Sequence, residues 1–237
     1  MREPGFSLLD IAALAPGLAH AADWANWAAD GVWPDNAALP ATPRIPPMQA
    51  RRMSVAARLA VQLALELMAR WQPGYLICIS RHGELQRTQT LLQKLIRAEP
   101  LSPTDFSMSV HNTVAGLTTI TAGLQMAATS LAAGEDGLQA GLMEACAWLG
   151  CQDAPVLVLC FDGQVPAFYQ PWVDTGVPPY AVGMLLTRGS QWRYRGSTAG
   201  TTGASALPQP LQFWRSWLKG ESACLLDAGA QQRCWQC

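Results

Sequence analysis

The sequence predicts an α/β fold, in which short buried strands alternate with longer helices around a central sheet. Two continuous apolar runs, 75–80 and 156–161, are typical of strands buried on both faces of a sheet. The segments beside them favour helices, because Ala, Leu, Met and Arg are frequent there. Shorter apolar segments predict further strands at 180–186, 191–194, 223–226 and 233–235.

The first helical region is expected within residues 8–29, as one or two short helices interrupted at Pro16, with Trp24 and Trp27 on one face. A long helix is expected from about 48 to 71, where a Pro-Gly pair follows and ends it. The remaining helices are predicted at 85–97, at 117–150 around a glycine-bearing turn, and at 211–218, with loops at 34–47 and 100–112.

The composition indicates a chain that buries much of itself or presents an apolar face to a partner. Half of the 237 residues are hydrophobic and only 14% are charged, against about 25% in an average soluble protein. Ten tryptophans favour a protein interface, where Trp is enriched. The length predicts one domain spanning 1–237, with the proline-rich loop 34–47 inside it. A net charge of −1 without basic runs argues against nucleic acid as a partner.

The chain is expected in the cytoplasm. No signal peptide is visible near the first residues, and no run of 18 apolar residues predicts a membrane span. The seven cysteines are irregularly spaced, which favours reduced thiols over a disulfide framework. Cys234 and Cys237 form a Cys-x-x-Cys pair, but no second pair at zinc spacing exists. We therefore predict neither a metal nor a cofactor.

Three motifs stand out along the chain. Residues 101–112 have the sequence LSPTDFSMSVHN, residues 51–54 are RRMS at the start of the long helix, and residues 80–84 are SRHGE after the first buried strand. Together they resemble the ketosynthase-like N-terminal domain family, in which a serine-proline turn leads into Ser-Val-His-Asn. The resemblance runs from about residue 48 to 186 and, more weakly, to the C-terminus.

The resemblance implies a thiolase-like fold, truncated to the N-terminal half of a ketosynthase. It also implies a partner. Family members resemble the chain-length factors of type II polyketide systems, notably those that make aryl polyenes, and such factors pair with an active ketosynthase. An acyl carrier protein is implied as a transient partner of the same complex, which elongates a polyketide or fatty-acid-like chain.

The sequence departs from an active ketosynthase at the nucleophile. Counting onward from Asn112 without gaps, the family's nucleophilic cysteine position falls on Glu135, and the turn 133–137 contains no cysteine. Acyl transfer between thioesters needs a group that is both a strong nucleophile and a good leaving group, and a carboxylate is not. Chain-length factors carry a glutamine there. Glu135 is either a mimic of that glutamine or a polar residue favoured at the start of a helix.

The second departure concerns the acid–base residues. In the family, the C-terminal half supplies two catalytic histidines, whereas this sequence has three histidines, His20, His82 and His111, none at such a position. We therefore expect a non-catalytic, chain-length-factor-like subunit that pairs with a ketosynthase and shapes its acyl tunnel, with no catalytic residues of its own.

The segment 102–112 is expected to face the partner or the tunnel. If it is extended, Phe106, Met108 and Val110 lie on one side, suited to an apolar partner, and Ser107, Ser109 and His111 on the other. The polar side, together with Asn112, would satisfy backbone groups that burial would otherwise leave unpaired.

Two alternatives remain open. In an extended segment Ser109 and His111 share a face, which permits a stand-alone acyltransferase or hydrolase, although no acidic third residue can be nominated and Gly-x-Ser-x-Gly is absent. The second alternative is a scaffold that only docks the acidic carrier protein. It would use the arginines of the long helix, for which a solvated helix face is the simpler explanation: Arg51, Arg52, Arg58 and Arg70.

Overall fold

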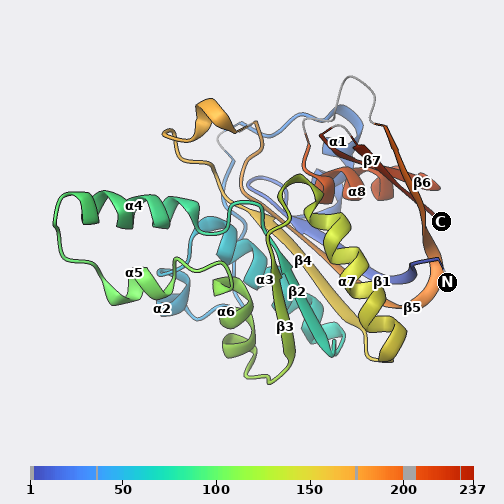
Figure 1. The fold of residues 1–237 in the computed structure, drawn as a ribbon, viewed down its shortest axis with the longest axis horizontal. Helices are drawn as coiled ribbons and strands as arrows, with labels where there is room; N and C mark the ends of the chain where they lie inside the picture. Colours follow the sequence, from blue (N-terminus) through green and yellow to red (C-terminus); the bar gives the residue numbers. More distant parts are fainter. Residues whose placement is uncertain (1–2, 36, 174–175, 200–206, 230) are drawn as a thin grey trace.

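The structure is a computed structural model that describes residues 3–35, 37–173, 176–199, 207–229 and 231–237. Helices and strands alternate along much of the chain (Figure 1). The elements are β1 (Gly5–Leu14), α1 (Ala21–Asp30), α2 (Pro47–Ala50), α3 (Val55–Arg70), β2 (Tyr75–Ile79), α4 (Leu85–Ile96), α5 (Pro103–Ser107), α6 (Thr113–Ala122), β3 (Ala127–Leu131), the 3₁₀ turn η1 (Gly134–Asp136), α7 (Gly137–Cys151), β4 (Val156–Asp162), the 3₁₀ turn η2 (Gln170–Trp172), β5 (Tyr180–Ala199), α8 (Gln209–Leu218), β6 (Ala223–Ala228) and β7 (Gln231–Gln236).

Within the described chain, seven strands form one mixed sheet in the order β3-β2-β4-β5-β7-β6, with β1 also paired to β5. Strand β2 is parallel to β3 and β4, whereas β5 is antiparallel to β4, β1 and β7. The two strands expected at 180–186 and 191–194 are parts of β5, whose first part pairs with β4 and whose last part pairs with β7. This arrangement confirms the predicted α/β class.

The prediction that a helix starts near residue 8 is wrong. The segment up to Leu14 is strand β1, and only Ala21–Asp30 is helical. Ala and Leu favour a helix locally, but the backbone of β1 pairs along β5, and this tertiary pairing overrides the local preference. The placement of Trp24 and Trp27 on one face is confirmed, since both are buried.

The predicted helices at 48–71 and 117–150 each divide in two. The first breaks before Val55 because the Ser54 hydroxyl accepts a hydrogen bond from the Ala57 N–H (3.1 Å) and caps a new helix. The second contains strand β3, which was not predicted. The sequence of β3, AATSL, shows neither alternation nor an apolar run, and only its pairing with β2 defines it.

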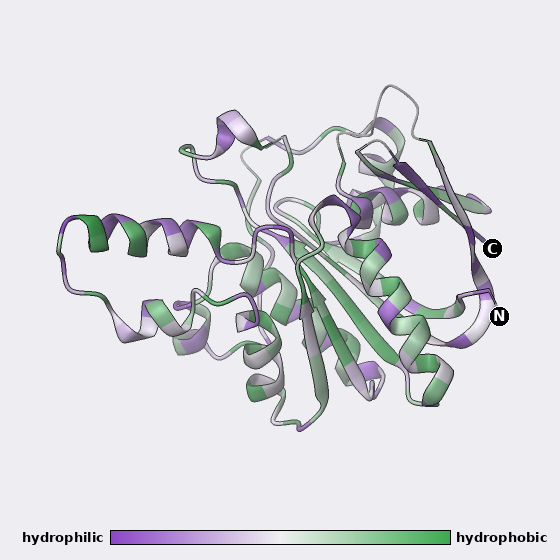
Figure 2. Ribbon diagram, viewed as in Figure 1, coloured by the Kyte–Doolittle hydropathy of each residue, from purple (hydrophilic) through white to green (hydrophobic). Residues whose placement is uncertain are grey.

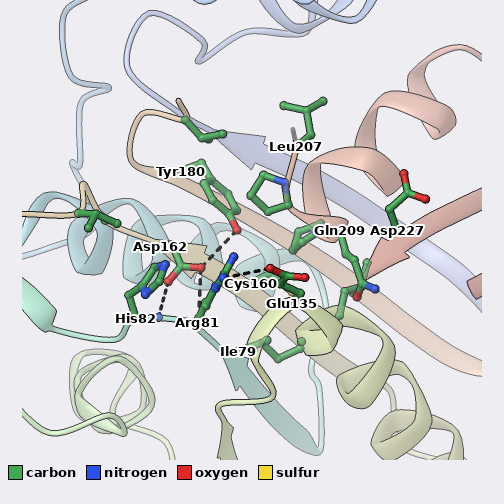
Figure 3. A pocket seen from close by; sticks show the side chains of 18 of the residues that line it. Ile79, Arg81, His82, Glu135, Cys160, Asp162, Tyr180, Leu207, Gln209 and Asp227 are labelled. Carbon is green, nitrogen blue, oxygen red and sulfur yellow. Dashed lines mark hydrogen bonds and ion pairs between the residues drawn. The ribbon is translucent and has the colours of Figure 1, made fainter. Parts of the chain in front are cut away.

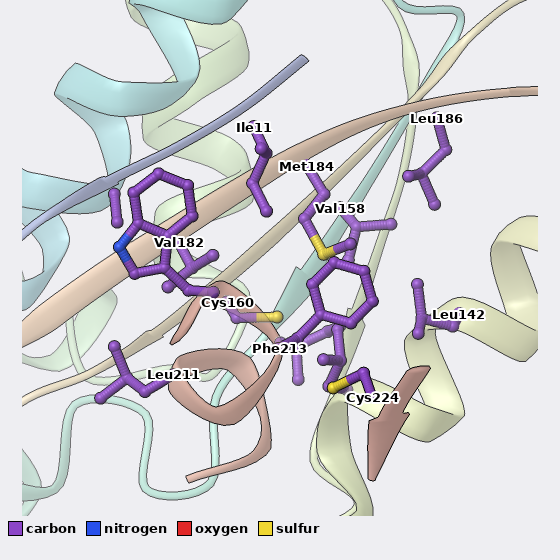
Figure 4. Packing of buried hydrophobic residues seen from close by; sticks show 14 of the residues in the cluster. Ile11, Leu142, Val158, Cys160, Val182, Met184, Leu186, Leu211, Phe213 and Cys224 are labelled. Carbon is purple, nitrogen blue, oxygen red and sulfur yellow. The ribbon is translucent and has the colours of Figure 1, made fainter. Parts of the chain in front are cut away.

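The two faces of the sheet are both covered, and β4 shows how (Figure 2). Alternate side chains of β4 point in opposite directions. Val156 and Val158 pack with the cluster under α1, α7 and α8, where Phe213 and Leu142 meet the sheet (Figure 4). Leu157 packs with the cluster under α3 and α6. A strand that is buried on both faces has a continuous apolar sequence, and this is why β4 could be predicted from the sequence.

Helix α3 is buried on most of its circumference, and the proline-rich segment helps to cover it. Ile45 is only 3% exposed and belongs to the cluster under α3. The Arg44 N–H donates to the Gln62 side-chain oxygen (3.0 Å), and the Gln62 amide donates to Glu66 (2.6 Å). The segment 37–46 thus satisfies a buried amide of α3 while it excludes water from its apolar surface. None of the described helices has the length and hydropathy needed to cross a membrane.

We expect Leu63→Ala to lower the free energy of unfolding by about 2–5 kcal/mol, because it leaves a cavity in the core. Leu63 is 1% exposed and packs on Gly183 of β5. Urea denaturation followed by circular dichroism measures the change. Leu92→Ala, at a position that is 47% exposed on α4, is the matched control and should change stability little; equal losses at both positions would contradict the core assignment.

Candidate functional site

The turn after β2 is fixed by a carboxylate at the end of β4. Asp162 accepts hydrogen bonds from the Ser80 hydroxyl (2.7 Å) and from the N–H groups of His82 (3.0 Å) and Arg81 (3.2 Å). The Ser80 hydroxyl in turn accepts from the Gly83 N–H (2.7 Å). Because parallel strands β2 and β4 end side by side, Asp162 reaches the turn directly (Figure 3). The turn therefore has one defined course.

The Ser-Val-His-Asn motif docks onto this turn through its histidine. His111 Nε2 donates to the Ser80 carbonyl oxygen (3.0 Å). Its ring lies 3.2 Å from the position that a Cβ on residue 83 would occupy. Residue 83 has φ +55°, a conformation that favours glycine. Glycine is thus favoured at this position for two reasons: its positive φ and the close approach of the His111 imidazole.

The remaining motif, residues 51–54, is bound to the end of the same turn and to the start of α4. The Ser54 hydroxyl donates to Glu84 (2.8 Å), and Arg87 donates to the Arg52 carbonyl oxygen (2.7 Å) and to Asp105 (2.7 Å). Burial raises the pKa of Glu84, against the opposing effects of the Ser54 hydrogen bond and the Arg87 charge. The three motifs singled out in the sequence therefore form one connected cluster at the base of α4.

The prediction that residues 102–112 are extended is wrong. The Ser102 hydroxyl accepts from the Asp105 N–H (3.2 Å) and caps helix α5, so residues two apart do not share a face. Phe106 is 63% exposed and Val110 is 43% exposed, but Met108 packs against the cluster under α3. The Ser107 hydroxyl donates to the Thr104 backbone carbonyl, and the backbone carbonyl of Asn112 accepts from the Gly116 N–H.

The structure gives Ser109 and His111 separate partners. The Ser109 hydroxyl donates to the Phe106 carbonyl (2.8 Å), whereas His111 is bound to Ser80. Among the hydrogen bonds of the described residues, none joins the two side chains. This arrangement lacks the base-to-nucleophile contact that an activated serine needs, and nothing in it favours the hydrolase alternative.

Glu135 lies in η1, at the start of the fifteen-residue helix α7. Its carboxylate forms an ion pair with Arg81 (3.1 Å) at a cavity of about 370 Å³ (Figure 3). The cavity lies at the ends of β2 and β4. Its described lining residues are Ile79, Arg81, His82, Gly134, Glu135, Gly137, Leu138, Cys160, Asp162, Gly163, Val165, Val177, Pro178, Tyr180, Leu207, Pro208, Gln209, Pro210, Asp227 and Gly229.

The neighbouring Asp136 is held from the opposite side. It accepts hydrogen bonds from Arg233 on β7 (2.6 Å) and from the Gln209 amide (3.0 Å). Gln209 also accepts from the Gln139 N–H (3.1 Å), and the Trp235 indole donates to Gln139 (2.8 Å). Burial acts to raise the pKa of Asp136, but the hydrogen bonds from Arg233 and Gln209 and the Arg233 charge outweigh it, so the pKa lies below its ordinary value.

Burial keeps three cysteine thiols near the site and in the core in their protonated form. Cys160 borders the cavity, and burial raises its pKa well above the ordinary value. Burial likewise raises the pKa of Cys78 to about 12 and that of Cys146 to about 11. Such thiols stay protonated at neutral pH, and the thiolate is the reactive form. Within the described ranges, no group of three or more His, Cys, Asp or Glu side chains is placed to hold a metal ion.

Sequence reasoning did not predict several residues of this site. Arg81 and His82 lie in a quoted motif but received no role, and Asp162 was overlooked although a polar residue directly after a buried strand is a usable signal. Arg233 and Gln209 carry no local signal, because they reach Asp136 across 97 and 73 residues of sequence.

The mixed sheet, its helix layers and this cavity define a ketosynthase-like protein. The family described as beta-ketoacyl synthase, N-terminal domain, matches residues 24–236, and the chain belongs to that family. The predicted thiolase-like fold, corresponding to the N-terminal half of a ketosynthase, is confirmed. No match was found among the curated proteins.

Among solved structures, the chain is similar to a chain in the ketosynthase (ApeO) from Xenorhabdus doucetiae in complex with its chain length factor (ApeC). The TM-score is 0.92 at 35% identity, and the match covers 98% of this chain and 99% of that chain. The ishigamide ketosynthase/chain length factor matches with a TM-score of 0.65 at 15% identity over 92% and 74% of the two chains. A beta-ketoacyl synthase from Burkholderia phymatum STM815 matches with a TM-score of 0.59 at 10% identity, over 94% of this chain and 71% of that chain. The last two similarities show the fold alone.

We expect the stability contributed by Asp136 to depend on pH. Its folded-state pKa lies below the ordinary value, so the contribution is complete above about pH 5, where the unfolded side chain is also ionised. It is lost as the pH falls through the folded-state pKa. Asp136→Asn should therefore be less stable than the wild type by about 1 kcal/mol at pH 7, and the difference should shrink below pH 4.

Thermal unfolding between pH 7 and pH 2.5 measures this difference. Asp153→Asn is the control, because the Asp153 side chain is 91% exposed in its ion pair with Arg188 and should show little difference at any pH. A difference for Asp136→Asn that stayed constant to the lowest pH would contradict the assigned role of Arg233.

Proposed function

We propose that the chain is a non-catalytic, chain-length-factor-like subunit that pairs with an active ketosynthase and shapes its acyl tunnel during polyketide or fatty-acid-like chain elongation. The observation that carries this proposal is the presence of Glu135, and not a cysteine, on the turn before α7. Glu135 stands where the count from Asn112 placed the nucleophile, at the edge of a cavity, and it is engaged in an ion pair with Arg81.

The similarity to the solved ketosynthase complex supports the proposal. The match covers 98% of this chain and 99% of the other, so the two chains have nearly the same length, and their identity is 35%. That complex joins a ketosynthase to its chain length factor. A chain of this size and fold thus occurs in such a complex, and the absence of a cysteine from the turn 133–137 of this chain favours the partner role over the catalytic one.

The projecting unit 85–112, here called the arm, offers a surface for the partner. Helices α4 and α5 extend away from the body of the molecule (Figure 1). Only Leu91 of α4 is buried, although the helix is strongly amphipathic. Large apolar side chains are exposed along the arm, and they are Leu92, Leu95, Ile96, Leu101, Phe106 and Val110. Exposed apolar patches of this kind mark interaction sites.

The surface continues from the arm into α6 and β3. Helix α6 carries no charged residue on any face, and its Ile120 is 72% exposed. Strand β3 lies at the end of the sheet, with one side unpaired in the described chain, and its exposed Ala127 and Ala128 permit close approach. Because an uncovered edge strand readily pairs with another chain, we place the ketosynthase interface on α5, α6 and β3.

The remaining parts of the proposal concern the assembly. The chain acts as one domain over 1–237, in the cytoplasm, and without a cofactor. An acyl carrier protein visits the complex transiently, and the exposed Arg51 and Arg52 suit an acidic partner. A scaffold that only docks the carrier protein is the second candidate, and these two arginines are the observation that favours it.

We expect Phe106→Ala to weaken the complex with the ketosynthase by about tenfold or more, since truncating a buried interface aromatic often costs about 2 kcal/mol. Analytical ultracentrifugation of the co-expressed pair measures the affinity, and product analysis shows any shift in chain length. Leu225→Ala is the control: Leu225 is 50% exposed, but it lies on β6, away from the arm (Figure 1). If neither variant changed the affinity, Phe106 would not belong to the interface. If the isolated chain had an activity of its own and Phe106→Ala abolished it, the chain would be an enzyme and not a partner subunit.

We also expect no covalent acyl-enzyme on this chain. Incubation with a reactive acyl thioester, followed by intact-mass and peptide-mass analysis, should find the acyl group on the ketosynthase and none on Glu135. Glu135→Ala should leave this labelling pattern unchanged, while it alters the cavity and the start of α7. An acyl group trapped on Glu135 would contradict the non-catalytic assignment.

A further inference from the structure

The cavity beside Glu135 is walled by this chain's own residues, separate from the surface assigned to the partner. Its apolar lining residues include Ile79, Leu138, Val165 and Val177. Its volume of about 370 Å³ lies in the range of small-molecule sites. A ligand with an apolar body therefore fits it.

The charged groups of the wall already have partners within the chain. Arg81 is paired with Glu135 at 3.1 Å. Asp162 accepts from a hydroxyl and two N–H groups of the turn after β2. Asp227 accepts from the Gln232 amide (2.8 Å). A charged ligand group that entered the cavity would lose water without gaining a free counterion, which is unfavourable.

Neutral hydrogen-bonding groups are offered instead. His82 borders the cavity (Figure 3). Burial lowers its pKa and Arg81 adds to this effect, against the attraction of Asp162, so the ring is neutral at pH 7. A neutral imidazole carries one donor and one acceptor. The second oxygen of Glu135 is a further acceptor at the same edge, beside the Gly229 backbone.

We propose that this cavity is a binding site for an uncharged ligand with an apolar chain and a hydrogen-bonding head, and that Glu135 determines this preference by neutralising Arg81. The inference goes beyond the partner role and does not depend on it. Glu135 thereby acts as a specificity-determining residue. Without its charge, Arg81 becomes an open site for an anion.

Three probes with the same alkyl chain test the preference: octanamide, octanoate and octylammonium. Isothermal titration of the full chain, alone or in its complex, should give a dissociation constant of about 1 mM or tighter for octanamide. Octanoate and octylammonium should bind at least about tenfold more weakly, since tenfold corresponds to about 1.4 kcal/mol. Equal binding of all three probes, or no binding of octanamide, would overturn the proposal.

Two variants assign the effect to the cavity. Glu135→Gln keeps the shape of the side chain and should strengthen octanoate binding by about tenfold or more, whereas Glu99→Gln, the same change on the distant arm, should have no effect. Val177→Trp should fill the cavity and abolish octanamide binding in a protein whose melting temperature is retained. If Glu135→Gln left octanoate binding unchanged, Glu135 would not set the preference. Because these measurements need no ketosynthase, their failure is distinct from failure of the partner role.

Discussion

The carboxylate of Asp162 is the constraint on which the functional end of the molecule depends. A carboxylate at the end of a buried strand is costly unless donors surround it. The turn after β2 supplies three: the Ser80 hydroxyl and the N–H groups of Arg81 and His82. Hydrogen bonds to a charged group are stronger than neutral ones, about 1.5–3 kcal/mol each. The turn is therefore held rigidly, and it positions both the arm and the cavity.

The backbone of this turn helps to hold the arm in place, and side chains of the same turn form part of the cavity wall. The Ser80 carbonyl receives His111 and so holds the end of the arm, while Glu84 and Arg87 bind the segments before α3 and around α5. On the other side, Arg81 projects to Glu135. One short motif thus connects the surface that we assign to a partner with the wall of the cavity. The low charge of the chain has two corresponding causes: a sheet buried on both faces, and an arm whose apolar side is uncovered.

The sequence predicted the elements whose signal is local. Strands β2 and β4 are apolar runs, and α4 and α8 lie within about two residues of their expected bounds. The failures share a physical cause, since pairing across the sheet defines β1 and β3 more than their own composition does. At the site, the count that led to Glu135 placed it on a turn at a cavity. The alternation assumed for 102–112 failed because Ser102 caps a helix, a signal that the Ser-Pro pair already contained.

The environment of Glu135 explains why one substitution changes the chemistry of the turn so completely. The N-terminus of α7 and the Arg81 guanidinium both favour negative charge at this point. With a thiol, such an environment lowers the pKa and creates a reactive thiolate. With a carboxylate, the same environment stabilises a group that is ionised already, and Arg233 holds the adjacent Asp136 from the other side. The features that would activate a cysteine here stabilise an ion pair, and this is the physical basis of the non-catalytic, selective role that we propose for the turn.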